Sequence, residues 1–257
     1  MTPTVRVVAV TRFLGVPDEL LDWEKANAAH ERGQNTGSDC ARLIECAGRT
    51  CYDSYGKGRS SAEYHAHILE VGHGSVLEHA SISFHISGVS RGLTHELVRH
   101  RVGVAISQRS TRYVDESESE WAWHPLVADE DYDLAAYDAH GLAVDLYKDL
   151  FRRISDRLIA RGVSQSAARK QARGAARGAL GNALSTELVW TANIRALRHF
   201  IEMRATEHAD GEIRLLANAL YLAAQPYCPE YLDEYERYDH PDMAGIGFGL
   251  RTEHRKV

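Results

Sequence analysis

Hydrophobic and polar residues alternate along several short stretches of the chain. Between Ser81 and Ser87 the apolar residues Ile82, Phe84 and Ile86 are separated by polar ones, which is the period of a half-buried strand. Similar β-rich patterns predict further strands at Val5–Val10 and Ser185–Thr191. The segment Ala105–Val114 is expected to be extended, or to be a loop with a strand at its end. The polar stretch Asp115–Trp123 predicts a surface loop.

Longer stretches repeat their apolar residues every three to four positions, which predicts amphipathic helices. These helices are expected from Pro17-Asp18-Glu19 onward and at Asp39–Ala47, Ser61–Val71, Ser90–Arg101, Asn193–Thr206 and Glu212–Ala224. Residues from about 129 to 178 predict two helical pieces broken at Gly162. Few strands and long helices indicate an α+β fold, with a small mixed or antiparallel sheet flanked by long helices.

The length of 257 residues suits one large domain or two small ones. We expect a single domain over residues 1–257, with a core of about residues 5–225 and a weakly patterned, partly loose tail over about 226–257. No apolar run approaches the ~18–20 residues that a membrane span needs. The N-terminus lacks the pattern of a secretory signal, so a cytoplasmic location and no membrane partner are expected.

The net charge of −6 argues against a protein that binds nucleic acid in bulk. Basic residues are nevertheless concentrated between Arg91 and Arg112, where five arginines face a single acid, Glu96. Arginine meets phosphate oxygens with two parallel hydrogen bonds, so this segment is suited to an anionic small molecule. The adjoining Ser107–Tyr113 adds hydroxyls and an amide for a hydrogen-bonding heterocycle. A solvated basic helix face is the alternative interpretation.

Cysteine and histidine positions raise a metal hypothesis, which the spacing does not favour. The four cysteines match no zinc pattern, and plain buried thiols are expected. Seven histidines lie between His65 and His100, yet no HExxH or HxxEH spacing occurs. For His85, which stands between apolar residues of a predicted strand, a core histidine is the favoured interpretation. We therefore expect no metal site.

The motif residues, taken together, resemble the flavin-dependent thymidylate synthase family. Arg99-His100-Arg101, followed after eight residues by Ser110-Thr111-Arg112, resembles that family's signature of Arg-His-Arg, seven or eight residues, and Ser-x-Arg. Segments His73–His79, Ser90–Leu97 and Asn193–Arg195, together with the segment starting at Arg204, resemble further family motifs in the same order. The resemblance extends over roughly residues 40–225.

This resemblance implies methylation of dUMP at C5 to give dTMP. FAD would be the cofactor, and methylenetetrahydrofolate and NADPH the co-substrates. The family works as a homotetramer with active sites shared between subunits. The chain has no GxGxxG fingerprint, and the family does not use a Rossmann fold for FAD. The flavin carries the redox chemistry and the protein supplies binding and electrostatics, which agrees with the lack of a convincing catalytic cysteine.

The resemblance also assigns roles to individual residues. For catalysis it implies His73 and Arg204, where Arg204 would stabilise negative charge on the pyrimidine. For FAD it implies Ser75, Glu78, Arg99, His100, Arg101, Ser107, Asn193, Arg195 and His199. For the nucleotide it implies Arg91, Glu96, Gln108, Arg109, Ser110, Arg112, Arg177 and Arg204.

Two departures from the family pattern affect the nucleotide pocket and leave the choice between dUMP and UMP open. The stretch Val102–Ile106 is one residue longer than in the seven-residue form, with Val104 near where serine is common. Gly181 stands where the family often has proline. The alternatives are C5-methylation of UMP in nucleoside-antibiotic biosynthesis, a non-catalytic nucleotide-binding module, and a metal-dependent hydrolase built on the histidines.

Overall fold

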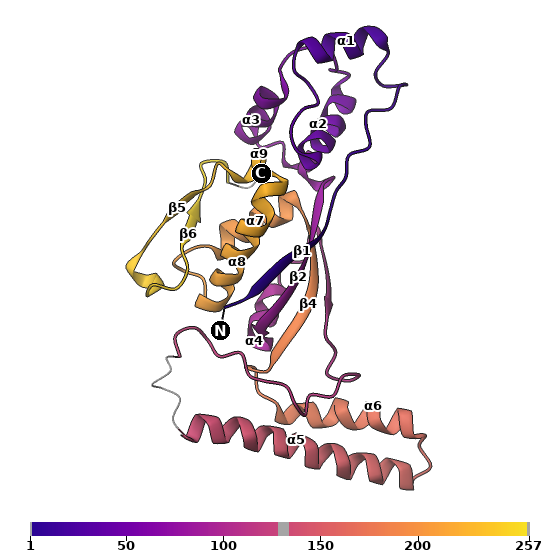
Figure 1. Ribbon diagram of the computed structural model, residues 1–257, viewed down its shortest axis with the longest axis vertical. Coiled ribbons are helices and arrows are strands. Elements are labelled where there is room, and N and C mark those ends of the chain that lie inside the picture. Colours follow the sequence, from indigo (N-terminus) through magenta and orange to yellow (C-terminus); the bar gives the residue numbers. More distant parts are fainter. Residues whose placement is uncertain (1, 128–133, 256–257) are drawn as a thin grey trace.

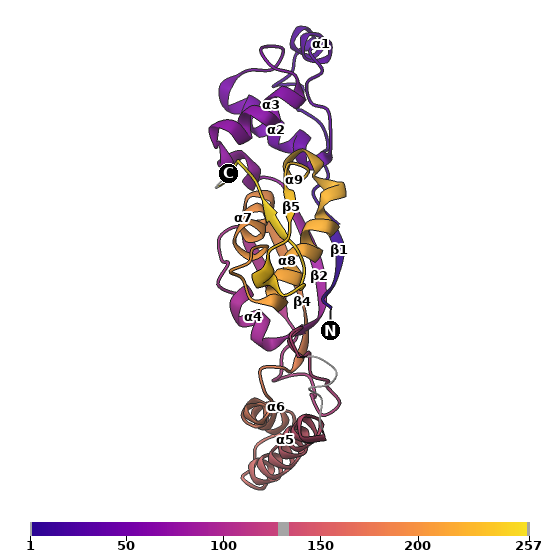
Figure 2. The ribbon, with the colours of Figure 1, turned by 90° about the vertical axis from the view of Figure 1, so that its left-hand side faces the viewer.

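The molecule is elongated and has three parts along its length (Figure 1). The computed structural model describes residues 2–127 and 134–255. Three N-terminal helices lie at one end, the sheet and the helices that pack on it lie in the middle, and a pair of long helices projects at the other end (Figures 1 and 2). Within the described ranges no helix is both long and apolar enough to cross a membrane.

The central sheet is antiparallel and has the order β1-β2-β4-β3. Its strands are β1 (Thr4–Val10), β2 (Ser81–Ser90), β3 (Val104–Gln108) and β4 (Ser185–Asn193). The three predicted strands fall on β1, β2 and β4. The predicted extended segment Ala105–Val114 is a strand only as far as Gln108, in β3. Its second half is wrong, because the N–H groups of Tyr113 and Val114 both bond to the Ser110 carbonyl in a turn. The antiparallel sheet with its helices confirms the α+β prediction.

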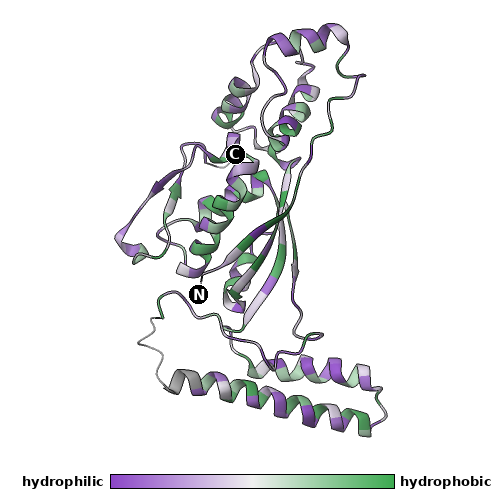
Figure 3. Ribbon diagram, in the orientation of Figure 1, coloured by the Kyte–Doolittle hydropathy of each residue, from purple (hydrophilic) through white to green (hydrophobic). Residues whose placement is uncertain are grey.

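One face of the sheet forms the core. Ile82, Phe84 and Ile86 of β2, and Trp190 of β4, are fully buried. Helices α7 (Ile194–Arg204) and α8 (Gly211–Ala224) lie along the sheet, and hydrophobic residues concentrate along α8 and the strands (Figures 1 and 3). The opposite face is polar: the Ser83 and Thr191 hydroxyls share a 2.8 Å hydrogen bond. His85 lies on this open face beside Glu187, at 3.5 Å, so the prediction of a core histidine is wrong.

The N-terminal helices begin at side-chain caps. They are α1 (Trp23–Glu31), α2 (Asp39–Tyr52) and α3 (Ser61–Val71), capped by Asp22, Ser38 and Ser60. The prediction of a helix from Pro17 is wrong: residues 17–21 form turns, with the Leu20 N–H bonded to the Pro17 carbonyl. The helix starts only at Trp23, because the Asp22 carboxylate accepts the otherwise unpaired N–H of Lys25.

Helix α4 (Arg91–Leu97) is shorter than predicted. After Leu97 the backbone tightens, since the N–H groups of Arg99 and His100 bond to carbonyls only three residues back. The chain then reverses into β3 through Gly103, whose φ of +70° favours glycine. The predicted helix Ser90–Arg101 therefore ends early, and Arg99 lies outside it.

Helices α5 (Leu134–Ala160) and α6 (Gln165–Ala176) form the projecting pair. They are separated at Gly162, as predicted, and this residue has a φ of +86°. The predicted start of the first helix, at about 129, lies outside the described residues. Short turns of 3-10 helix complete the chain: η1 (Gly74–Glu78), η3 (Arg177–Ala179), η4 (Gln225–Tyr227) and η5 (Pro241–Met243).

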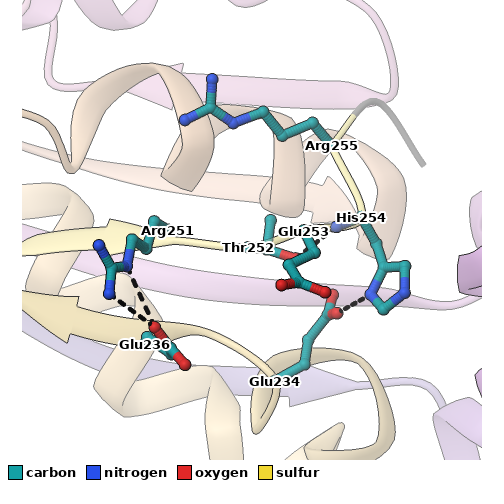
Figure 4. Close-up of a pocket in the computed structure, with 7 residues that line it drawn as sticks. All are labelled: Glu234, Glu236, Arg251, Thr252, Glu253, His254 and Arg255. Carbon is teal, nitrogen blue, oxygen red and sulfur yellow. Dashed lines mark hydrogen bonds and ion pairs between the residues drawn. The ribbon is translucent and has the colours of Figure 1, made fainter.

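The C-terminal segment packs against the core, so the prediction of a partly loose tail is wrong for residues 228–255. It forms α9 (Pro229–Leu232), β5 (Glu236–Tyr238) and β6 (Gly249–Arg251). The fully buried guanidinium of Arg198 on α7 donates to the carbonyls of Tyr231 and His254 and lies 2.5 Å from the Glu234 carboxylate. Figure 4 shows Glu234 turned toward the His254 ring. The segment thus closes around one buried arginine.

Candidate active site

Arg204, at the end of α7, joins the Arg-His-Arg motif to helix α4. Its Nε donates to Nε2 of His100 at 3.0 Å, and its Nη1 donates to the Glu96 carboxylate at 2.8 Å. The His100 ring packs edge-on against Phe200, with ring centroids 4.8 Å apart. Three predicted site residues from two distant parts of the sequence therefore meet at one point.

The electrostatics of this cluster fix the charge of His100. Burial, followed by the positive charge of Arg204 and the proximity of His199, lowers the pKa of His100 to about 4. The ring is neutral at pH 7, and its Nε2 must be unprotonated to accept the hydrogen bond from Arg204. Burial also raises the pKa of Glu96, against the opposing effect of Arg204.

Most residues assigned to FAD lie at the end of the sheet where β2 begins and β4 ends. Ser81 pairs with Asn193 there, and Asn193 caps α7 by accepting from the Ala196 N–H. The carboxylate of Glu78, in η1, lies 2.5 Å from Arg195. Neighbouring predicted residues at this end present exposed side chains: His73, Ser75, Arg99, Arg101 and His199. We call this region the flavin end. Ser107 lies further along, exposed near the end of β3, where it pairs with Val189.

Most residues assigned to the nucleotide lie where β2 ends and β4 begins. Arg91, His95, Thr111 and Arg177 line an open cavity of about 330 Å³. The Arg177 Nη1 donates to the Thr111 hydroxyl at 3.2 Å. Burial and the like charge of Arg177 lower the pKa of Arg91, although Glu116 acts against this. Two cations held around one cavity form a site for an anion, and we call this region the nucleotide end.

The remaining nucleotide residues are placed differently from one another. The Gln108 amide donates to the Thr94 hydroxyl at 3.1 Å. Ser110 accepts from the N–H of Arg112, whose exposed side chain reaches Gly174 of α6. Arg109 is the exception among the residues predicted for this end. It lines a separate hollow together with acidic residues, and its Nη2 lies 3.5 Å from the carboxylate of the buried Glu116.

The two ends are far apart within one chain. Strand β2 connects them with ten residues, which at about 3.4 Å per residue is roughly 30 Å. Arg204, Glu96 and His100 lie between them, since α4 runs back from the nucleotide end toward the flavin end. A single copy of the chain therefore does not gather all the predicted residues into one cavity.

Sequence reasoning missed two supporting hydroxyl groups, and it included a third, that of Thr111, only as part of the Ser107–Tyr113 segment. Thr111 is buried beside Arg177, and the hydroxyls of Thr94 and Thr186 lie 3.1 and 3.4 Å from the Gln108 amide. For Thr94 and Thr186, the position within or beside the motifs was the only signal available, because neither residue carries a charge or repeats with a period. They hold site residues in place, which only coordinates reveal.

Comparison with known proteins decides the family. Residues 34–230 match the family model described as thymidylate synthase complementing protein, which is well over half of the chain. The chain belongs to the thymidylate synthase complementing protein family. This membership confirms the predicted family and, with it, the predicted class of enzyme.

Similar relatives of this family member are named flavin-dependent thymidylate synthase. The one from Mycolicibacterium gilvum is 42% identical over 237 residues, covering 90% of this chain and 89% of that protein. The one from Mycobacterium leprae strain TN is 43% identical over 222 residues, covering 83% and 82%. A crystal structure of thymidylate synthase X from Helicobacter pylori, with FAD and dUMP, matches with a TM-score of 0.55 and 21% identity, over 90% of this chain and 97% of that chain. At that identity the likeness shows the fold alone.

The thiols and histidines of this family member do not gather into a metal site. In the part of the chain that the structure describes, no group of three or more His, Cys, Asp or Glu residues could hold a metal ion. All four cysteines are free; Cys40 and Cys228 are buried, whereas Cys51 is exposed, contrary to the prediction of buried thiols throughout.

Proposed function

We propose that this enzyme methylates C5 of dUMP to give dTMP, with FAD as cofactor, methylenetetrahydrofolate as carbon donor and NADPH as reductant. The observation that carries the proposal is the contact of Arg204 with both His100 and Glu96, which joins the two halves of the motif set. Identity of 42% to a named flavin-dependent thymidylate synthase over nine-tenths of the chain supports it. The FAD and dUMP in the Helicobacter pylori structure support the choice of ligands.

The flavin end has the chemistry to hold FAD. Arg99 and Arg101 are exposed, and neither forms an ion pair with any residue in the described ranges. Such guanidiniums suit the FAD pyrophosphate. Polar partners for the other parts of FAD are available in the Asn193 amide and the Glu78–Arg195 pair. When bound, FAD supplies the hydride chemistry. The chain's residues would hold it in place and exclude water.

The nucleotide end suits the phosphate of dUMP. Arg91 and Arg177 face one cavity, and Arg112 is exposed nearby. Burial, with a smaller contribution from the charge of Arg177, lowers the pKa of Arg91, and a phosphate dianion placed between the two arginines would offset both effects. We propose that Arg112 and Arg177 clamp the phosphate, because guanidinium and phosphate geometries match.

Arg204 would then act on the pyrimidine. We propose that it lies against a ring carbonyl, where its fixed charge stabilises negative charge as C5 becomes nucleophilic. Neutral His100 accepts the Nε hydrogen bond and so fixes the orientation of the guanidinium, while Glu96 holds one Nη group.

We propose that the complete site forms between copies of the chain in a homotetramer. The flavin end and the nucleotide end are roughly 30 Å apart in one chain, so one ring stacked on the other requires two chains. The four free cysteines agree with a cytoplasmic location, where thiols stay reduced, and we propose that location.

The test is a product assay run side by side on dUMP and UMP, with FAD, methylenetetrahydrofolate and NADPH. We expect dTMP from dUMP and at most slow conversion of UMP. Preferred methylation of UMP would assign the enzyme to the alternative substrate. Tight dUMP binding without NADPH oxidation or product would identify a non-catalytic module.

A further inference from the structure

A second cavity lies between α2 and α3, away from the nucleotide end. It measures about 330 Å³, and its wall includes Tyr52, Lys57, Arg59, Tyr64 and His73. His73 belongs to the flavin end, so the cavity opens beside the proposed flavin position. Nothing in the proposed function assigns this space a ligand. We call it the α2–α3 cavity.

The rim of the α2–α3 cavity is a preformed loop. The buried guanidinium of Arg49 donates to the carbonyls of Ser54, Lys57 and Arg59, at 3.2, 3.4 and 2.7 Å. The amide of buried Gln34 donates to the same Lys57 and Arg59 carbonyls, at 2.8 and 3.0 Å. Two buried side chains thus hold the loop's backbone inward and keep Lys57 and Arg59 in the cavity wall, where Lys57 also donates to the Asp53 carbonyl at 3.2 Å.

The aromatic part of the wall is fixed equally well. The Tyr64 ring lies under the Arg49 guanidinium, 4.9 Å from its centroid, and burial raises the pKa of Tyr64 to about 12. A β-carbon on Gly48 would stand 1.8 Å from the Tyr64 hydroxyl oxygen, so glycine is needed there for the ring to fit. Tyr52 is largely exposed beside it and Ile68 adds apolar surface.

The charged side chains that line the cavity are all basic. Its lining includes Arg49, Lys57 and Arg59 as cations, two histidines, and no acidic side chain. The Arg49 charge is balanced by Glu45 at 2.6 Å, and Lys57 lies 3.6 Å from the exposed Asp53. The guanidinium of Arg59 forms no hydrogen bond or ion pair with any residue that the structure describes. The cavity therefore favours a ligand with an aromatic or apolar body and negative charge at its end.

We propose that the α2–α3 cavity binds the anionic end of a co-substrate, with Lys57 and Arg59 pairing to its carboxylates or phosphate and Tyr52 and Tyr64 packing on its body. The proposal rests on the proposed function, in which a second anionic molecule must approach the flavin end. Both co-substrates named above have this chemistry: the folate carries glutamate carboxylates, and NADPH carries phosphates. The shared recognition is a polyanion on an aromatic body.

The experiment compares the double variant Lys57→Gln/Arg59→Gln with a matched control, Lys148→Gln/Arg152→Gln. The control removes one lysine and one arginine from the exposed surface of α5. With FAD and dUMP saturating, the KM is measured for methylenetetrahydrofolate with one and with several glutamates, and for NADPH against NADH. The cavity variant should raise the KM of one anionic co-substrate at least about 10-fold with kcat nearly unchanged, whereas the control should leave it unchanged.

The two sets of KM measurements distinguish the folate from NADPH as the ligand of the cavity. An increase that grows with the number of glutamates assigns the cavity to the folate, and an increase for NADPH but not NADH assigns it to the 2′-phosphate. Unchanged KM values for both co-substrates in an active cavity variant would overturn the proposal. Direct titration of each co-substrate into the FAD-loaded protein is independent of turnover: weaker binding by the cavity variant supports the cavity even if dUMP is not methylated, which would refute only the proposed function.

Discussion

The Nε of Arg204 donates a hydrogen bond to Nε2 of His100 at 3.0 Å, although the two residues are 104 positions apart in the sequence. This contact fixes a cation beside a neutral imidazole, because the pKa of His100 is lowered to about 4. It connects the Arg-His-Arg motif to the end of α7. The central chemistry of the proposed function depends on it.

Replacing Arg204 should impair turnover far more than folding. Arg204→Gln is expected to lower kcat/KM for dUMP by about 100- to 1000-fold, the usual effect of removing one group that stabilises developing charge. Because Arg204 and Glu96 are partly exposed, the loss in unfolding free energy should stay within about 1 kcal/mol. Steady-state kinetics and thermal melting measure both. Arg251→Gln, which removes another exposed ion-paired arginine, is the control, and a similar activity loss in it would contradict the assignment.

The protonation of His100 predicts a pH dependence of stability. The folded chain holds His100 at a pKa of about 4, against an ordinary value of 6.5, so between these values the unfolded chain binds the proton more readily. The contribution of His100 to stability is full above about pH 6.5 and is lost as the pH falls toward 4.

Thermal melting of wild type and His100→Gln across this range measures the effect. The wild type should lose stability relative to the variant as the pH falls from 7 to 4. The pKa of buried His65 is also lowered, mainly by burial, but this residue is present in both proteins and cancels in the difference. A difference in Tm that does not change with pH would contradict a neutral His100.

Arg112 should contribute to nucleotide affinity alone. Its side chain is exposed, so Arg112→Ala is expected to keep the fold while weakening dUMP binding by about 10- to 100-fold, the loss of a hydrogen bond to a charged group. Isothermal titration of dUMP into the FAD-loaded protein gives the Kd. Arg152→Ala on α5 should bind dUMP normally, and unchanged affinity in the Arg112 variant would show that the phosphate lies elsewhere.

The C-terminal segment should matter for stability through Arg198. Glu234→Ala leaves a fully buried guanidinium without its carboxylate, and we expect a loss of about 3 kcal/mol in unfolding free energy. Glu236→Ala is the matched control, since Glu236 pairs with the exposed Arg251 and should cost less than about 1 kcal/mol. Denaturant unfolding of both variants gives the comparison, and equal losses would rule out the special role of Arg198.

The strands could be predicted because alternation is a local property. Ile82, Phe84 and Ile86 mark the buried face of β2 in the sequence and in the structure. The end of α4 could not be predicted, since the sequence contains no helix-breaking residue between Leu97 and Gly103. The tertiary contact of His100 with Arg204 accompanies the tighter turn there. The C-terminal segment was misjudged because its burial depends on Arg198, which stands 36 residues before Glu234.

The site could be predicted as a set of residues but not as a geometry. Contiguous motifs identified Arg99–Arg101 and Ser110–Arg112, because arginine and hydroxyl side chains are the residue types that bind anions. The supporting hydroxyls of Thr94 and Thr186 carry no such signal. The separation between the flavin end and the nucleotide end depends on the length of β2. In the proposed function, two chains of an oligomer bring a flavin end and a nucleotide end together, which the sequence of one chain does not show.

The most direct test of the shared site combines two inactive variants. Arg101→Ala damages the flavin end and Arg177→Ala the nucleotide end. If each site takes one end from each of two chains, co-expression of the two variants should restore up to about a quarter of wild-type activity through random pairing in a symmetric oligomer. No activity above that of the separate variants, in mixed oligomers that still bind FAD and dUMP, would contradict the account.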